Sequence, residues 1–172
     1  MTTPRFAFEF SLNESLEAPA PRKLDYRDAL DWLAEACRLG AVRIAIGEQR
    51  VVTSLSEVTQ SLAGVVWHGL MDPFLTRQTS EWERILSEEW RLVLHHSNGR
   101  VSIELRKMSN LIAGDDEIAS DEHDPVMIRD AIADLLDRVI SRFESTNSWF
   151  RNSTGREVFQ EKMRHFKEID AL

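Results

Sequence analysis

Asn98-Gly99, which stands between two runs of alternating apolar residues, restricts the fold of this chain more than any other feature. An Asn-Gly pair favours a two-residue type I′ turn, because both of its positions need a positive φ. With Ser97 placed opposite Arg100, the large apolar residues of the two runs meet on one face. The pairs that result are His96 with Val101, Leu94 with Ile103, and Leu92 with Leu105. The sequence therefore predicts an antiparallel hairpin with strands near 90–96 and 100–107.

The residues just before this hairpin allow two interpretations. Ser80-Glu81-Trp82-Glu83 has the pattern of a capping box, which predicts a helix near 80–88 with Trp82, Ile85 and Leu86 directed inward. Helical spacing continues to Trp90, so a helix that runs past Trp90 is the alternative. We prefer a strand from Trp90 onward because the turn needs a strand on each side. Whether residues 81–90 belong to a helix or to the hairpin strand stays open.

The period of the apolar residues predicts the other elements. Alternation with a period of two indicates strands, and recurrence every three to four residues indicates helices. The expected strands lie near 5–12 and 42–47, with a short additional strand near 50–53, and the expected helices lie near 25–39, 55–71, 125–144 and 155–168. The strongest helix is that of 125–144, whose apolar stripe runs from Ile128 to Phe143.

Capping residues mark where several helices begin and end. Capping boxes start at Ser54 and Thr154, and Asp124-Pro125 places an N-cap before a proline at the first helical position. Asp72-Pro73 should end the helix of 55–71. Because hairpins occur without strict β-α-β alternation, we expect an α+β fold in which an antiparallel sheet has about four to five helices packed mainly on one face. No repeat or long linker appears, so residues 1–172 are expected to form a single globular domain.

Charge, cysteine content and hydropathy limit the class of protein. The chain has 21 Lys and Arg against 29 Asp and Glu, and its net charge of −8 disfavours general binding to nucleic acid. One cysteine, Cys37, allows no intrachain disulfide, which fits a reducing compartment. The longest stretch without charged residues, 58–71, is shorter than the ~20 residues that cross a bilayer. The first ten residues lack the apolar segment of a secretory signal. We therefore expect a cytoplasmic protein that does not bind membranes.

An acidic run from Asp115 to Asp124 contains six Asp and Glu and no Lys or Arg. It fits a solvated loop that leads into the helix cap at Asp124. It also fits a contact surface for a basic partner, since carboxylates raise the rate of association with such a partner. The predicted steering residues are Asp115, Asp116, Glu117, Asp121 and Glu122.

An aromatic pair, Trp149-Phe150, lies in a polar segment between two predicted helices. Packing under its own loop is the simpler interpretation. An aromatic pair beside Arg151 is also typical of an interface hot spot. We therefore predict that Trp149 and Phe150 anchor the partner.

The sequence shows no strong catalytic or metal-binding motif. It lacks a glycine-rich phosphate loop, a nucleophile elbow and an H-E-x-x-H pattern. His95 and His96 are neighbours on a strand, so they point to opposite faces and cannot hold one ion. We expect no catalytic residue, no metal and no cofactor.

The outer face of the hairpin offers an alternative site for an anion, formed by Arg91, His95 and Arg106. Arg91 lies opposite Arg106, and like charges in that position cost stability. Glu104 lies diagonal to Arg91, where its negative charge would offset the repulsion between the two arginines. An enzyme with dispersed site residues around residues 90–106 would use this group to hold an anionic substrate.

Size, acidity and expected α+β composition are together similar to those of bacterial immunity proteins, although no motif identifies a family. The sequence favours a non-enzymatic inhibitory protein, of the immunity or antitoxin type, that blocks a basic toxin or nuclease-like partner by occlusion. A structural or adaptor subunit that self-associates, as a homodimer for example, is the first alternative. The enzyme around residues 90–106 is the second.

Overall fold

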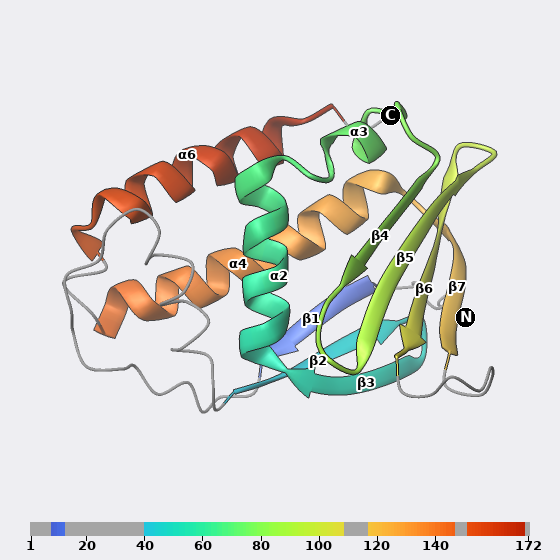
Figure 1. The fold of residues 1–172 in the computed structure, drawn as a ribbon, viewed down its shortest axis with the longest axis horizontal. Helices are drawn as coiled ribbons and strands as arrows, with labels where there is room; N and C mark the ends of the chain where they lie inside the picture. The colour runs from blue at the N-terminus through green and yellow to red at the C-terminus, as the bar shows by residue number, and fades with distance from the viewer. Residues whose placement is uncertain (1–7, 13–39, 109–116, 147–150, 171–172) are drawn as a thin grey trace, which may run out of the picture.

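The computed structural model describes residues 8–12, 40–108, 117–146 and 151–170. The predicted helix of 25–39 lies outside these ranges. Two antiparallel sheets and several helices make up the described part, so the predicted α+β class is confirmed (Figure 1). No helix in these ranges has an apolar segment long enough to cross a membrane.

The first sheet has three strands in the order β1-β2-β3. Its strands are β1 (Phe8–Leu12), β2 (Ala41–Ile46) and β3 (Gln49–Ser54). All three correspond to strands expected from the alternation of apolar residues. Gly47 lies in the turn that connects β2 to β3. Its φ is 59°, a value that a residue without a Cβ adopts easily.

The second sheet has four strands in the order β4-β5-β6-β7. They are β4 (Glu81–Ile85), β5 (Trp90–Ser97), β6 (Arg100–Lys107) and β7 (Glu117–His123). The predicted hairpin register is confirmed, from Ser97 opposite Arg100 to Arg91 opposite Arg106. Asn98 and Gly99 have φ values of 49° and 78°, as a type I′ turn requires.

Two sequence predictions in this sheet were wrong. Residues 81–85 form strand β4 and not a helix near 80–88. Trp82 is buried but Ile85 is 51% exposed, so these residues do not share one buried helical face. The acidic run, expected to be a loop, contributes strand β7, because Glu117 to His123 find a hydrogen-bonding partner in β6.

Helix α2 (Leu55–His68) begins and ends at defined caps. Its N-cap is Ser54, whose hydroxyl accepts from the N–H of Glu57 at 3.4 Å. It ends earlier than predicted, because Gly69 takes a left-handed conformation (φ 61°) and its N–H caps the helix. Asp72-Pro73, expected to end this helix, instead begins the short helix α3 (Asp72–Leu75).

Two longer helices follow the second sheet. Helix α4 (Pro125–Thr146) starts as predicted, since Asp124 Oδ1 accepts from the N–H of Val126 at 2.9 Å. Helix α6 (Thr154–Glu168) has its N-cap at Ser153, one residue before the predicted box. The hydroxyl of Ser153 accepts from the N–H of Arg156 at 3.2 Å.

The helices lie on one side of the four-stranded sheet, as Figure 1 shows. Helix α4 contacts β1, α2 and α6, and α2 also contacts β2 and β3. Trp67 of α2 stacks on Phe159 of α6, with ring centroids 6.0 Å apart. A continuous apolar core joins both sheets to these helices, and it contains the whole predicted stripe of α4. The buried stripe residues are Ile128, Ile132, Leu135, Leu136, Val139, Ile140 and Phe143.

Candidate interaction surface

The outer face of the four-stranded sheet is rich in charged residues. The registers place three rows of side chains across β4, β5 and β6. These rows are Glu81, His95 and Ser102; Glu83, Val93 and Glu104; and Ile85, Arg91 and Arg106. The three residues predicted as an anion site, Arg91, His95 and Arg106, therefore share one face, as the predicted register requires.

Both arginines of this group bind carboxylates. Arg91 Nη1 lies 3.1 Å from Glu83 Oε1, and Arg106 Nε donates to Glu104 Oε2 at 2.8 Å. A second bond joins Arg106 Nη2 to the same oxygen. Two carboxylates therefore offset the repulsion between the facing guanidinium groups, where the sequence indicated only Glu104. An anion bound here would compete with carboxylates already in place.

The described part of the acidic run lies on β7, an edge strand of the sheet. Glu117 is opposite Arg106 in the register, and a bulge interrupts the pairing between Val101 and Ile103. Asp121 and Glu122 fall on β7 in this bulged region. At ~3.3 Å per residue, Glu117 and Asp121 are about 13 Å apart along the strand. Asp115 and Asp116 lie outside the described residues.

The predicted aromatic anchor, Trp149 and Phe150, also lies outside the described residues. The residue that follows it is held in a defined position. Arg151 Nε and Nη2 donate to the backbone oxygen of Glu144 at 3.0 and 2.6 Å. These bonds satisfy a carbonyl near the end of α4, which has no partner within the helix.

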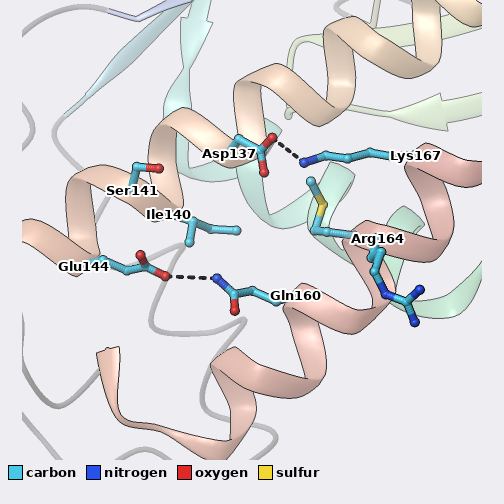
Figure 2. A pocket seen from close by; sticks show the side chains of 8 residues that line it. Asp137, Ile140, Ser141, Glu144, Gln160, Arg164 and Lys167 are labelled. Carbon is cyan, nitrogen blue, oxygen red and sulfur yellow. Dashed lines mark hydrogen bonds and ion pairs between the residues drawn. The ribbon is translucent and has the colours of Figure 1, made fainter.

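A groove of about 280 Å³ separates α4 from α6 (Figure 2). Ile140 and Met163 supply its apolar part. Lys167 Nζ binds Asp137 Oδ2 at 2.5 Å, while Gln160 and Arg156 bond to Glu144. The sequence does not indicate this groove, because each of its polar residues, taken singly, fits a solvated helix face.

A second groove, of about 610 Å³, lies between the first half of α2 and the end of β4. Ser61 Oγ donates to the backbone oxygen of Ile85 at 2.6 Å and accepts from Arg84 Nε at 3.0 Å. Glu57 Oε2 accepts from the N–H of Glu88 at 3.0 Å. The sequence does not indicate this groove either, because the helix predicted over 80–88 leaves no strand edge beside α2.

Two of the described histidines, His96 and His165, contact neighbouring residues. His96 Nε2 lies 2.8 Å from the backbone oxygen of Phe74, so this nitrogen carries the proton and donates. The His96 ring also stacks on Phe74. Asp72 Oδ2 lies 3.5 Å from His165 Nε2. His68 is exposed.

No catalytic set converges at these places within the described residues. No group of three His, Cys, Asp or Glu there is arranged to hold a metal ion. The cations of the outer sheet face and of the α4–α6 groove bind neighbouring carboxylates. What the described surface offers is charged strand edges and shallow grooves, which suit contact with a macromolecule. Comparisons of the chain with family models, with curated proteins and with solved structures found no match.

Proposed function

We propose that this chain is a cytoplasmic, non-enzymatic protein of the immunity or antitoxin type that blocks a basic partner protein by occlusion. One observation carries the proposal: the acidic run supplies an edge strand, β7, and not a loop alone. Glu117 pairs with Arg106 of β6, and Asp121 and Glu122 lie on the same strand between the paired residues Ser120 and His123. Acidic positions on an ordered strand meet a rigid partner with less loss of conformational entropy than positions on a mobile loop.

The charge balance supports this proposal over an enzyme that holds an anionic substrate. A net charge of −8 attracts basic surfaces and raises the rate of encounter with them. An anionic substrate at the hairpin would have to separate Arg91 from Glu83 and Arg106 from Glu104. Asp115 and Asp116 would add to the charge that steers a basic partner, and Trp149 and Phe150 would anchor the contact.

The test is capture of partners at low salt from the cells that make this protein, followed by assay of what is captured. The proposal expects a basic protein that elutes as salt rises, and whose activity is lost when one equivalent of this chain is added. If the captured proteins are acidic, or if the activity of a basic one is unaffected by the chain, the proposal is wrong.

A charge-matched pair of variants tests the role of β7. The triple variant Glu117→Gln, Asp121→Asn, Glu122→Gln should slow association and reduce its salt dependence. The control Glu48→Gln, Asp134→Asn, Glu157→Gln removes the same net charge from exposed positions elsewhere. Equal association rates for the two variants would remove β7 from the interface.

A further inference from the structure

Strand β4 pairs with another strand on one side only, the side of β5. Leu86 donates its N–H to the oxygen of Trp90 at 2.9 Å, and Ser80 accepts from the N–H of His96 at 2.8 Å. Backbone groups of an antiparallel strand point alternately toward its partner and away from it. The even-numbered residues of β4 therefore point to β5. The odd-numbered ones, Glu81, Glu83 and Ile85, direct their N–H and C=O groups to the free edge.

This free edge is open in its middle. At one end of the edge, the hydroxyl of Ser61 already donates a hydrogen bond to the backbone oxygen of Ile85. Within the described part of the chain, nothing bonds to the N–H or C=O of Glu83 on the side away from β5. A bare strand edge of this kind is a template for a further strand.

Most charged side chains beside the edge are acidic, and Ile85 supplies an exposed apolar side chain. Ile85 is 51% exposed and lies in the α2–β4 groove. Arg84 binds Ser61, and Arg91 binds Glu83. Four carboxylates therefore surround the edge against these two guanidinium groups. They are Glu57, Glu81, Glu83 and Glu88.

We propose that an extended basic segment of the partner protein adds to β4 as a further antiparallel strand. Its backbone bonds to the N–H and C=O of Glu83. On the outer face it places an apolar side chain beside Ile85 and basic side chains beside Glu83 and Glu81. The matching sequence is apolar-x-basic-x-basic, because residues two apart on a strand share a face. A second copy of this chain fits less well, since pairing β4 with β4 sets carboxylates against carboxylates.

This inference rests on the proposed function, because it specifies how a basic partner binds. The proposed function and this inference can be refuted independently of each other. Salt-dependent inhibition of a whole partner can persist without any strand addition at β4, and a peptide can add to β4 without an inhibited partner. The test therefore uses a peptide of defined sequence and the full chain.

The probe is a capped peptide Thr-Val-Thr-Lys-Thr-Lys-Thr, titrated into isotopically labelled protein while backbone amide signals are recorded by NMR. The amide signals of Glu81 and Glu83 should shift downfield, and the exchange of the Glu83 amide proton with solvent should slow. The control peptide Thr-Val-Lys-Thr-Thr-Lys-Thr has the same composition, but its two lysines lie on opposite faces of a strand. It should bind more weakly.

Two variants separate the backbone contact from the charge. Glu83→Pro removes the outward N–H, which β5 does not use, and edge strands tolerate proline at such positions. Because both variants lack the carboxylate, Glu83→Pro should bind the peptide about tenfold or more weakly than Glu83→Gln does, as expected for a lost edge hydrogen bond and a mismatched backbone. Glu83→Gln keeps the N–H, so it should lower only the salt-dependent part of the affinity, and it remains informative if the proline variant fails to fold.

Three results would overturn the inference. Equal binding of both peptides would mean attraction by charge alone. Peptide-induced shifts on β3 or β7, without shifts on β4, would place the contact at another edge. Concentration-dependent shifts of Glu83 in the absence of peptide, together with a doubled mass in sedimentation, would mean that a second copy occupies the edge.

Discussion

Replacing Thr59 by valine should stabilise this protein, although most substitutions at buried positions destabilise. Thr59 lies in α2 with no exposed surface, and its Oγ1 makes no hydrogen bond with any part of the chain that the structure describes. Stability measurements on protein mutants show that burial of an unpaired hydroxyl costs about 1–3 kcal/mol. Valine has nearly the same shape and a similar helix propensity, so little of this gain is lost elsewhere.

The expected gain in the free energy of unfolding is therefore about 1–2 kcal/mol. Urea unfolding followed by tryptophan fluorescence should give a higher midpoint with an unchanged slope. In a thermal scan, Tm should rise by about 2–8 °C, at roughly 2–4 °C per kcal/mol for a chain of this length.

The matched control is Thr53→Val, which makes the same chemical change at a buried threonine that does have a partner. Thr53 Oγ1 donates to Ser87 Oγ at 3.0 Å. Loss of this hydrogen bond should destabilise the protein by about 1 kcal/mol. Opposite signs for the two variants are the expected result. If Thr59→Val lowers the midpoint as Thr53→Val does, the Thr59 hydroxyl has a partner and the reasoning is refuted.

Three further substitutions test the turn and two ion pairs. Gly99→Ala should cost about 1–2 kcal/mol, because φ at this position is 78°, and a thermal melt without a lower Tm would contradict a type I′ turn. The hydrogen bond and charge of Arg164 hold the pKa of Glu161 below its ordinary value of 4.5, so Arg164→Met should raise that pKa in an NMR titration. Since this pKa is depressed, any stability from the pair is present above pH 4.5 and is lost as pH falls through the folded-state pKa. Glu104→Gln should destabilise by about 0.5–1 kcal/mol in urea, because it leaves Arg106 facing another arginine; an unchanged midpoint would show that repulsion there is screened.

The hairpin of residues 90–107 was predictable because several local signals agree. The turn needs positive φ at two positions, and Asn98-Gly99 supplies them at low cost. The same register that the turn imposes also buries Leu92 opposite Leu105. When turn chemistry and apolar pattern indicate the same register, few alternatives remain.

Strand β4 was mispredicted because its apolar spacing fits two periods. Trp82, Ile85 and Leu86 have the spacing of a helical stripe, yet Trp82 and Leu86 also lie on one face of a strand. Only the pairing with β5 decides between them, and that pairing is a tertiary contact. In the structure Trp82 and Leu86 are buried and Ile85 is exposed, which is the pattern of a strand. Both the α2–β4 groove and the free edge depend on this choice.

The carboxylates beside β4 explain how an open strand edge can be both protected and selective. An exposed edge invites pairing with any strand, including another copy of the chain. Glu81 and Glu83 oppose a second β4, because equal charges would then face each other across the new pair. The same carboxylates attract a strand that carries lysine or arginine at alternate positions. Removing both charges should therefore have two linked effects: weaker binding of a basic strand and stronger self-association. A variant that shows only one of them would mean that another feature controls this edge.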